Sequence, residues 1–554
     1  MAENIAGRET EKKEKESKEF TLEIKSPAIL VLLVFLALAF FMELQVTLNT
    51  PISFGDEGFH TRMSQWIGEN AELPVFRPFE GSDIDRTAFE SPPMWTLLEG
   101  SFTFLFGFHD VFIKVLTPFI AFLGGVSLFL LGRKIYNEKV AFVAAVIFAT
   151  TPSLVTYSVL FYMDVMLAFF FTLFLLTFII AVQNSSKKYW LLSGIFGGLT
   201  VLTKTPGIAV FFFIILVFLY QLFKERKLVS LFSLFKKYFV LVAIVLLVCT
   251  GFFVRSFYYY KSPDADLPLP FFKPVWRIYT FNETYQFAGR TESVSSEASL
   301  LGMGITQFLN FAYGNIWFVV LGGLAGISLI LMRRKEADIL LFLTFVTMFF
   351  ILSQSISRAE DTARHVLAWV PVIALFAAVY FEQLYDFIKV NLKKLGIVAL
   401  VIFAVVLFFG YQAMADKLTT MAQVKQFSPA FFEACNWVKI NLPKNSSLYT
   451  VWAHRAAYNC QTNAMGTFAD LSLSEDLNHT LLVAKQQGVT HIFIQKFSID
   501  FQNQHFSEKY DWNFVKFLEA HPEHFVNVFE NGPSLDVCVQ QGSCDGNIIY
   551  EIKY

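Results

Sequence analysis

AILVLLVFLALAFFMELQVTL (Ala28–Leu48) is an apolar run of membrane-spanning length, and Gly55-Asp56-Glu57 follows it closely. About 20 apolar residues in a helix cross the ~30 Å hydrocarbon core of a bilayer. The run is too long for the apolar region of a signal peptide, and no small-residue cleavage site follows it. We therefore interpret it as a first transmembrane helix. The preceding residues 1–27, rich in Glu and Lys, are expected to form a disordered cytoplasmic tail.

The composition is typical of a protein with many membrane spans. Hydrophobic residues make up 55% of the 554-residue chain, with 66 Phe, and the mean hydropathy is +0.50. Charged residues make up 16%, whereas soluble domains carry about 25%. The net charge of −2 and the absence of a basic stripe give no indication of a nucleic-acid partner.

Further apolar runs divide the chain into alternating membrane and polar segments. With the first run they number eleven, and the short Trp190–Leu202 is the least regular. The runs are 28–48, 111–131, 140–157, 165–182, 190–202, 207–222, 239–257, 308–331, 339–352, 366–385 and 395–411.

Basic clusters fall in every second connection, on the side that also holds the amino-terminal tail. They are Arg133/Lys134/Lys139, Lys187/Lys188, Lys224/Arg226/Lys227/Lys236/Lys237, Arg333/Arg334/Lys335 and Lys389/Lys393/Lys394. The positive-inside rule makes this side cytoplasmic. We therefore expect an α-helical polytopic membrane protein with about 11 transmembrane helices over residues 28–412. Its long extracytoplasmic loops would cover residues 50–110 and 258–307.

Residues 413–554 have the composition of a soluble domain, which this topology places outside the cytoplasm. Short β-like runs alternate with helical stretches and predict a small α/β domain. The expected strands are 447–452, 490–494, 525–529, 535–539 and 547–553, and the expected helices are 429–440, 477–487 and 511–521.

Four of the five cysteines lie in this last domain. Cys538 and Cys544 enclose a segment that contains Gln-Gln-Gly-Ser, a hairpin that a disulfide would close, and Cys435 with Cys460 is a candidate second pair. Disulfides would agree with an oxidising, extracytoplasmic location. A metal site is less favoured because no Cys-x-x-Cys spacing occurs.

The first outer loop carries adjacent carboxylates directly after a membrane helix. Asp56 and Glu57 lie on a turn between Gly55 and Gly58, before a helix-like segment. A carboxylate at such a place can deprotonate a substrate hydroxyl as its oxygen attacks. The alternative is that Asp56 only caps the helix that follows.

Two further acids lie on the same side. Glu90 precedes Ser91-Pro92-Pro93, and the prolines would stiffen the segment that presents it; a plain helix start is the equal alternative. Asp164 lies in the apolar sequence Phe161–Met166, at the outer end of a span. Ionisable groups in apolar membrane segments are costly and point to function.

Three cations occur where the positive-inside rule disfavours them: Lys204, Arg255 and Arg364. Together with the acids, they suggest a site for an anionic group at the membrane surface, such as a lipid phosphate. The alternative for each single cation is contact with lipid headgroups. His60, His365 and Arg290 are further candidates in the outer loops.

The order of these motifs resembles the GT-C superfamily of integral-membrane glycosyltransferases, in particular the protein O-mannosyltransferase and lipid A aminoarabinose transferase group. The likeness runs from about residue 40 to 385. The matching segments are Gly55-Asp56-Glu57, Phe89–Pro93, Phe161–Ala168, Gly198–Gly207, Arg255-Ser256-Phe257 with Lys261-Ser262-Pro263, and Ala363–Pro371.

The resemblance implies a role for each candidate residue. Asp56, with Glu57 beside it, would act as base or orient the acceptor, and Glu90 would shape the acceptor or a metal site. Asp164 would belong to the donor side.

Lys204, Arg255 and Arg364 would hold the donor phosphate. Ser91 and Thr205 depart from the Lys and Gly that are common in the group. No cofactor is certain from the resemblance, which leaves a divalent metal open.

We therefore expect a transferase that moves a monosaccharide from a polyprenyl- or dolichyl-phosphate carrier to an extracytoplasmic acceptor, with inversion. Its partners would be the lipid-linked sugar, the acceptor (protein, lipid or glycan) and the bilayer, with no nucleic acid. One alternative is a transporter or flippase of a lipid-linked substrate, which predicts charges in mid-span and similar halves. A second alternative is an inactive scaffold whose outer domain binds a partner.

Overall fold

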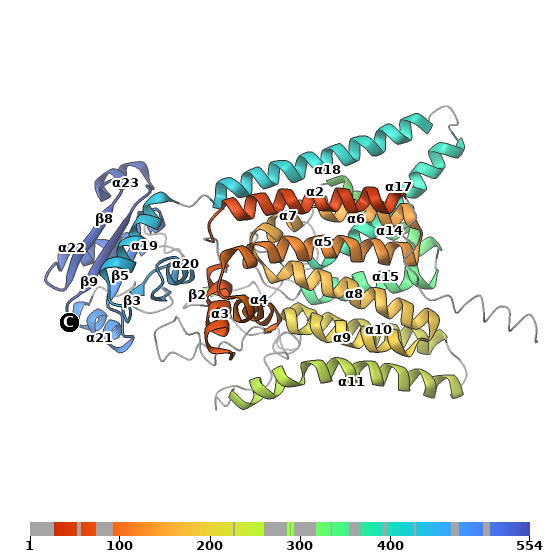
Figure 1. Cartoon of the computed structure of the whole chain (residues 1–554), viewed down its shortest axis with the longest axis horizontal. Helices are drawn as coiled ribbons and strands as arrows, with labels where there is room; N and C mark the ends of the chain where they lie inside the picture. The colour runs from red at the N-terminus through yellow and green to blue at the C-terminus, as the bar shows by residue number, and fades with distance from the viewer. Residues whose placement is uncertain are drawn as a thin grey trace, which may run out of the picture.

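The computed structural model describes most of the chain as a helical bundle with a mixed α/β domain at one end (Figure 1). The described residues are 27–52, 57–73, 92–224, 228–259, 285–287, 290–292, 317–333, 335–353, 364, 367–391, 396–425, 428–466, 476–501 and 510–554.

Each of the eleven expected spans overlaps a helix of the bundle. The helices are α2 (Pro27–Asn49), α5 (Asp110–Ile135), α6 (Glu138–Thr150), α7 (Pro152–Val159), α8 (Met163–Asn184), α9 (Lys187–Thr203), α10 (Ala209–Lys224), α11 (Leu228–Tyr259), α14 (Trp317–Arg333), α15 (Glu336–Ser353), α17 (Val370–Asn391) and α18 (Gly396–Lys425). Short 3₁₀ turns, η1 (Thr205–Ile208) and η2 (Leu367–Trp369), precede α10 and α17.

Within the described residues, 6 helices are long and apolar enough to cross a membrane, and the bent pair α6–α7 would make 7. The chain is therefore an integral membrane protein, whereas eleven crossings stay a prediction. Large apolar side chains such as Leu30, Leu38 and Phe41 are exposed along α2. A surface of this kind belongs in lipid, because soluble proteins rarely expose large contiguous apolar patches.

The expected span over residues 140–157 is two helices that meet at an angle of 55°. The break lies at Thr151, whose backbone is extended, and Pro152 begins α7. Proline disfavours the α conformation in the residue before it and is well suited to the first turn of a new helix. The bend aims α7 at the turn that leads into α8.

α8 lies at the centre of the bundle, with most of its length buried. An aromatic cluster joins it to its neighbours: the ring of Phe178 lies 5.2 Å from Phe213 of α10, 5.7 Å from Trp190 of α9 and 6.2 Å from Tyr238 of α11. Offset and edge-on aromatic pairs of this kind add stability beyond the area they bury. The C-terminal half of α8 is thus held firmly among α9, α10 and α11.

Connections that carry basic clusters meet at the end of the bundle remote from the α/β domain. The Tyr136 hydroxyl donates to Asp338 Oδ1 (2.9 Å), and Lys224 Nζ lies 3.1 Å from Glu336 Oε2. These contacts join the α5–α6, α10–α11 and α14–α15 connections. Their shared location agrees with the alternation expected from the sequence.

At the opposite end lie two short helices, α3 (Glu57–Asn70) and α4 (Met94–Phe106), which pack on each other. The added Cβ of an alanine at Gly68 would lie 2.3 Å from Thr103 Cγ2, so glycine is needed for this close approach. The Ser64 and Thr103 hydroxyls share a hydrogen bond (2.9 Å) across the contact. α3 and α4 therefore form a firm layer between the bundle and the α/β domain.

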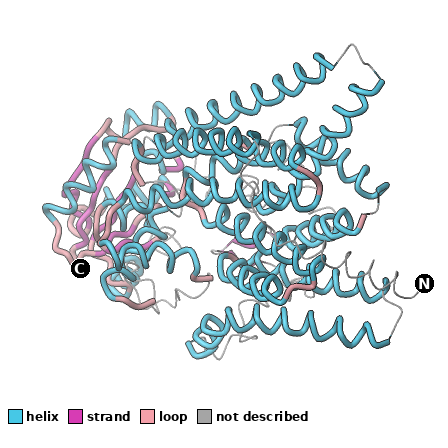
Figure 2. Tube along the Cα trace, turned by 45° about the vertical axis from the view of Figure 1, so that its right-hand side comes forward, coloured by secondary structure: helices cyan, strands magenta, loops and turns pink. Residues whose placement is uncertain are grey.

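The C-terminal domain contains a five-stranded mixed sheet of order β4-β3-β5-β9-β8. Figure 2 shows its strands, in magenta, gathered at the end of the molecule that holds the C-terminus. β3 pairs in parallel with β4 and β5, whereas β9 is antiparallel to β5 and β8. The strands are β4 (Asn463–Met465), β3 (Ser447–Tyr449), β5 (His491–Gln495), β9 (Asn547–Ile552) and β8 (Phe525–Asn531). The helices are α19 (Pro429–Asn441), α20 (Ala453–Asn459), α21 (Leu477–Gln486), α22 (Trp512–Ala520) and α23 (Leu535–Gln541).

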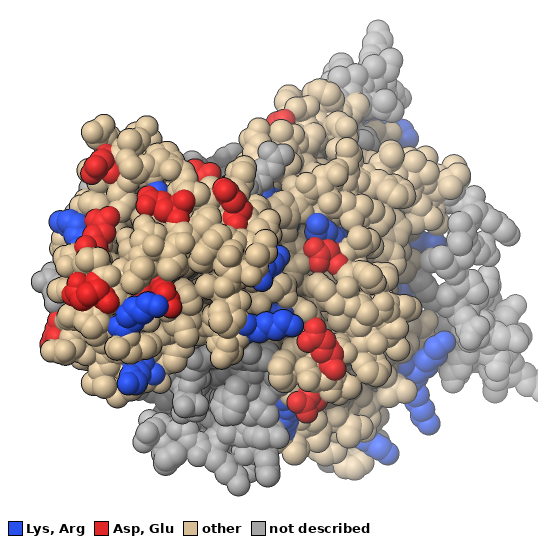
Figure 3. Space-filling view, turned by 60° about the vertical axis from the view of Figure 1, so that its left-hand side comes forward, with Lys and Arg blue, Asp and Glu red and all other residues tan. Residues whose placement is uncertain are grey.

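Small two-stranded sheets complete the described strands. β1 (Tyr285–Phe287) is antiparallel to β2 (Arg290–Glu292), and β6 (Ile499–Asp500) is parallel to β7 (Tyr510–Asp511). In Figure 3 charged side chains of both signs are spread over the C-terminal domain, whereas the visible side of the bundle is mostly uncharged. The expected helical membrane domain and C-terminal α/β domain are both confirmed.

The strand expected over residues 535–539 is wrong, because this segment is the helix α23. Leu535 and Cys538 are buried while the residues between them are exposed, which is the spacing of a helix face. The hairpin expected between Cys538 and Cys544 is also wrong. Gly542 instead ends the helix in the left-handed conformation (φ 73°), which glycine adopts without strain.

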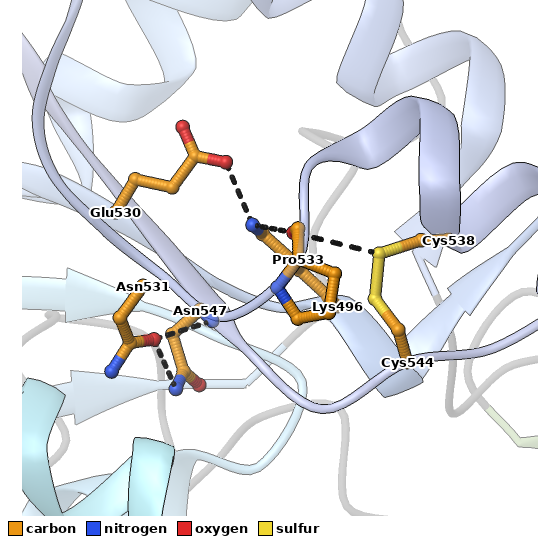
Figure 4. The surroundings of a disulfide bond; sticks show 7 residues. All are labelled: Lys496, Glu530, Asn531, Pro533, Cys538, Cys544 and Asn547. Atoms are coloured by element: carbon orange, nitrogen blue, oxygen red, sulfur yellow. Dashed lines mark hydrogen bonds and ion pairs between the residues drawn. A yellow bond between two sulfur atoms is a disulfide. The ribbon is translucent and has the colours of Figure 1, made fainter.

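Disulfides join Cys435 to Cys460 and Cys538 to Cys544. The second disulfide lies beside Lys496, which is buried and donates to Glu530 Oε1 (2.7 Å) and to the carbonyl of Pro533 (2.5 Å) (Figure 4). The boundary expected after residue 412 falls inside α18, which continues to Lys425. The last turns of this helix thus carry the chain from the bundle to the outer domain.

Candidate functional site

Asp164 is buried in the first turn of α8, where its carboxylate faces two cations. Lys204 Nζ lies 2.6 Å from Asp164 Oδ1, and Arg364 Nε lies 3.8 Å from Oδ2. The Asp164 side chain is 2% exposed, whereas those of Lys204 and Arg364 are 12% and 21% exposed. Three residues from distant parts of the sequence therefore form one cluster with its cations nearest to the surface.

The backbone after α9 explains how Lys204 reaches this cluster. α9 ends at Thr203, and Lys204 is extended before the 3₁₀ turn η1 begins at Thr205. A Cβ at Gly207 would lie 2.2 Å from the carbonyl oxygen of Thr200, so only glycine permits the chain to turn back this closely. Gly207 also donates its N–H to the Lys204 carbonyl (2.8 Å). This tight turn sets the direction of the lysine.

Arg364 is held from the other side by an aromatic ring. Its guanidinium carbon lies 4.9 Å from the ring centre of Tyr162, which itself packs edge-on against Tyr157 at 5.5 Å. A guanidinium over an aromatic face gains electrostatic stabilisation from the ring quadrupole. Arg364 is thereby placed between Tyr162 and the carboxylate of Asp164.

Glu57 forms the second charged centre at this end of the bundle. It begins α3, and its Oε1 lies 2.7 Å from Nζ of Lys425, with both side chains 0% exposed. Lys425 also donates to the carbonyl of Val159 (2.9 Å) and lies 4.1 Å from the ring centre of Phe161. Lys425 was not predicted from the sequence to belong to the site.

The C-terminal domain closes over this region through α20. Tyr458 donates to Asp110 Oδ1 (2.7 Å), and Asn459 donates to the carbonyl of Ile52 (3.0 Å). A Cβ at Gly58 would lie 2.5 Å from the carbonyl oxygen of His454, so α3 touches α20 backbone. The outer domain is therefore docked on the elements that carry the acidic motifs.

Arg455 of α20 is a further functional candidate that the sequence did not reveal. Its guanidinium carbon lies 4.8 Å from the ring centre of Trp452. Burial lowers the pKa of Arg455 to about 10, although Glu57 and Tyr162 act in the opposite direction. The charge of Arg455 thus interacts electrostatically with both Glu57 and Tyr162.

The other candidates are placed differently. Arg255 donates from Nη2 to the carbonyl of Leu73 (2.5 Å), and His60 is buried in α3 with its ring 5.2 Å from Phe59. Arg290 begins β2, but its side chain is not described. Asp56, Glu90 and His365 lie outside the described residues.

Within the described ranges, no three His, Cys, Asp or Glu side chains are grouped closely enough to hold a metal ion. The carboxylates considered for a metal, Asp56 and Glu90, are not among those residues. The described cluster instead presents ammonium and guanidinium groups, which suit an anion.

Comparison with known proteins agrees with this architecture. Residues 90–253 match the model of the dolichyl-phosphate-mannose-protein mannosyltransferase family. The match includes Glu90, Asp164 and Lys204 and ends before Arg255. No curated protein sequence matches the chain.

Solved structures of several membrane glycosyltransferases are similar to the chain. The oligosaccharyltransferase of Archaeoglobus fulgidus, solved with Zn and sulfate, aligns with a TM-score of 0.62 at 14% identity, covering 90% of this chain and 72% of that one. ArnT from Cupriavidus metallidurans, bound to undecaprenyl phosphate, aligns with a TM-score of 0.58 at 12% identity, covering 94% and 97%.

The mycobacterial arabinofuranosyltransferase AftD aligns with a TM-score of 0.55 at 13% identity, covering 94% of this chain and 40% of that one. Likeness at such low identity establishes the fold, and activity is argued from the site. The chain is an integral-membrane protein with the GT-C glycosyltransferase fold.

Proposed function

We propose that the chain is a glycosyltransferase that moves a monosaccharide from a polyprenyl- or dolichyl-phosphate donor to an extracytoplasmic acceptor. The observation that carries the proposal is the cluster of Lys204 and Arg364 about Asp164. Two partly exposed cations flank one buried carboxylate, so these three side chains together carry a net positive charge that would attract an anion. A lipid phosphate at the bilayer surface is such an anion.

Two solved neighbours support a lipid-phosphate ligand for this fold. ArnT was solved with undecaprenyl phosphate, and the archaeal oligosaccharyltransferase AglB with an inhibitory peptide and a dolichol-phosphate. The second of these aligns with the chain at a TM-score of 0.58. By analogy, this chain would bind a lipid-linked sugar and an acceptor at the same end of its bundle.

In the proposed reaction Asp56 accepts the proton of the acceptor hydroxyl while its oxygen attacks the anomeric carbon. The bond between that carbon and the phosphate oxygen breaks, and the leaving phosphate keeps the electron pair. Lys204 and Arg364 stabilise the charge that develops on this oxygen. Attack from the face opposite the leaving group inverts the anomeric configuration.

The remaining candidates take supporting roles in the proposal. Asp164 orients the two cations, and Arg255 is a further contact for the donor phosphate. Glu90 lies on the acceptor side, where it would shape the acceptor pocket or bind a divalent ion if the enzyme uses one. Glu57 holds the start of α3 through its ion pair with Lys425.

The location of the site follows from charge. Basic connections meet at one end of the bundle, and the candidate site lies with the C-terminal domain at the other. The positive-inside rule then supports an extracytoplasmic location for the site and for residues 413–554. Cytosolic nucleotide sugars do not reach that face, whereas a lipid carrier delivers its sugar there.

The test is transfer of label from a panel of radiolabelled polyprenyl-phosphate sugars to host membrane extract by purified protein in lipid. Wild type is compared with Asp56→Asn, which keeps the size of the side chain and removes its basicity. We expect label to move with wild type and to fall by ~10²–10⁴-fold with the variant. Equal transfer by both proteins would remove Asp56 as the base.

A further inference from the structure

Lys425 stands at the meeting point of three segments that are far apart in sequence. It is the last residue of α18, the helix that leads into the C-terminal domain. Its ammonium contacts the carboxylate of Glu57 at the start of α3 (2.7 Å) and the carbonyl of Val159 at the end of α7 (2.9 Å). It also lies over the ring of Phe161, in the turn that enters α8 (4.1 Å).

These contacts account for an ammonium group in a fully buried place. A buried charge is tolerated only with an opposite charge and hydrogen bonds, and both are supplied here. Removing either partner would strand the other charge away from water. The start of α3 and the α7–α8 turn therefore cannot separate from Lys425 without a large loss of stabilisation.

The α7–α8 turn has a conformation that needs such support. Phe161 has φ 52°, in the left-handed region that a residue with a bulky side chain rarely adopts. Conformations of this kind persist where surrounding contacts impose them. The ammonium over the Phe161 ring and its bond to the Val159 carbonyl are contacts on both sides of this turn.

Both segments lead directly to the acidic motifs of the proposed reaction. Glu57 follows Asp56 by one peptide bond, and Phe161 precedes Asp164 by three residues. Through these short connections, the position of Lys425 sets where both motifs begin.

We propose that Lys425 is a positioning residue that holds the acceptor-side and donor-side motifs in one geometry and couples it to the docked C-terminal domain. The expected effect of Lys425 on kcat rests on the proposed function. The structural part of the inference, one lysine fixing two segments, stands on the contacts alone. It therefore has a test that does not require turnover.

The structural test is hydrogen–deuterium exchange of purified protein in lipid, followed in peptides that cover residues 50–60 and 157–166. Two variants are compared with wild type: Lys425→Met and the double variant Glu57→Gln/Lys425→Met. The double variant removes both charges of the buried pair, so it replaces the single variant in the test if that variant does not fold. Lys496→Met is the matched control, because Lys496 is equally buried and ion-paired but lies within the outer domain (Figure 4).

We expect faster exchange in both peptides for the Lys425 variants and wild-type exchange in both for Lys496→Met. Exchange that stays at the wild-type rate in either peptide of the folded double variant would overturn the inference. An increase in both peptides with Lys496→Met as well would also overturn it, because loss of any buried lysine would then suffice.

The kinetic test separates positioning from loss of fold. For the folded double variant we expect kcat to fall ~10–100-fold, because misplacement by about 1 Å has effects of this size. The affinity for undecaprenyl phosphate should change less than ~3-fold, because Lys204 and Arg364 keep their charges. Unchanged kcat would contradict the positioning role.

Adding Lys425→Met to Asp56→Asn should cost little further activity if the lysine acts through that carboxylate. If the activity losses of the two single changes multiply in the combined variant, Lys425 does not act through Asp56. Suppose instead that Asp56→Asn transfers label as well as wild type, while the Lys425 variants exchange faster in both peptides. Asp56 is then not the base, and the structural part of the inference stands. The two failures are thus distinguishable.

Discussion

Lys204 Nζ lies 2.6 Å from Asp164 Oδ1, although the two residues are 40 positions apart and the helices α8 and α9 run between them. The carboxylate is buried at the start of α8, and the lysine leaves α9 on a tight turn. With Arg364 on the second carboxylate oxygen, the arrangement presents cations toward the surface and keeps the acid behind them. An anionic headgroup would meet the cations first.

The first prediction concerns this cation pair. Lys204→Met or Arg364→Met should weaken binding of undecaprenyl phosphate, because each removes a hydrogen bond to a charged group, worth ~1.5–3 kcal/mol or roughly 10–150-fold. Binding to protein in lipid discs measures the effect directly. Lys188→Met is the control, because Lys188 is exposed near the opposite end of α9. Equal loss in the control would show a general charge effect.

A second prediction tests the contact between α3 and the outer domain. Gly58→Ala places a Cβ 2.5 Å from the His454 carbonyl oxygen, so backbone must move. Overpacking of this kind destabilises by ~1–3 kcal/mol. Thermal unfolding should therefore begin earlier and transfer should fall.

The matched variant is Gly251→Ala, because nothing lies within 4 Å of a Cβ at Gly251. It should leave both stability and transfer close to wild type. If the two alanine variants behave alike, the close docking of α20 on α3 is not what limits substitution at Gly58.

The third prediction concerns Glu99 of α4, a helix too short to cross a bilayer. Its side chain is buried, and neither carboxylate oxygen has a hydrogen-bond partner among the residues that the structure describes. Burial raises the pKa of Glu99 well above 4.5. The folded state therefore holds a proton that the unfolded state releases, so its stability declines as the pH rises from 4.5 toward the folded pKa.

Glu99→Leu should remove this decline and raise stability at neutral pH by ~1–3 kcal/mol, because an unsatisfied polar group is replaced by an apolar one. Unfolding curves recorded at several values between about pH 5 and pH 8 measure how the free energy of unfolding changes with pH. Glu69→Leu, an exposed position of α3, should change stability by less than ~0.5 kcal/mol. A destabilised Glu99→Leu would show that the carboxyl has a partner in the working protein.

The two disulfides should differ in what they contribute to the outer domain. They close loops with sequence separations of 25 and 6. Loop entropy predicts ~3–4 kcal/mol lost on replacing Cys435 and Cys460 by serine and ~2 kcal/mol for Cys538 and Cys544. Denaturant unfolding of the full chain, monitored by the fluorescence of the outer domain, measures the loss of stability for each pair. The reverse order would rule out loop closure as the main source of the difference.

Much of the fold could be predicted from the sequence because the membrane imposes a strong pattern. Each apolar run overlaps at least one helix, and connections with basic clusters meet at one end. The bend at Thr151–Pro152 was missed because the apolar run continues unbroken through it. α23 was misjudged because five residues rich in Val satisfy the composition of a strand, and only their burial reveals the period of a helix.

The site could be predicted only in part. Asp164, Lys204 and Arg364 each stand out because a charge next to an apolar span is costly, and the structure brings these three together. Lys425 and Arg455 gave no such signal, because they lie in polar sequence where charges are common. Their burial depends on segments far away in the sequence: Lys425 contacts Glu57 and Phe161, and Arg455 lies on α20, which packs against α3.

The most direct test of the account is a stoichiometric one. Purified protein in lipid is given one radiolabelled polyprenyl-phosphate sugar at a time with host membrane extract, and both labelled acceptor and free polyprenyl phosphate are quantified. We expect one donor to yield the two products in equal amounts, and we expect Asp164→Asn and Lys204→Met to reduce both products together. Donor that is bound or moved across the bilayer with its sugar still attached, or no reaction with any donor, would contradict glycosyl transfer as the function.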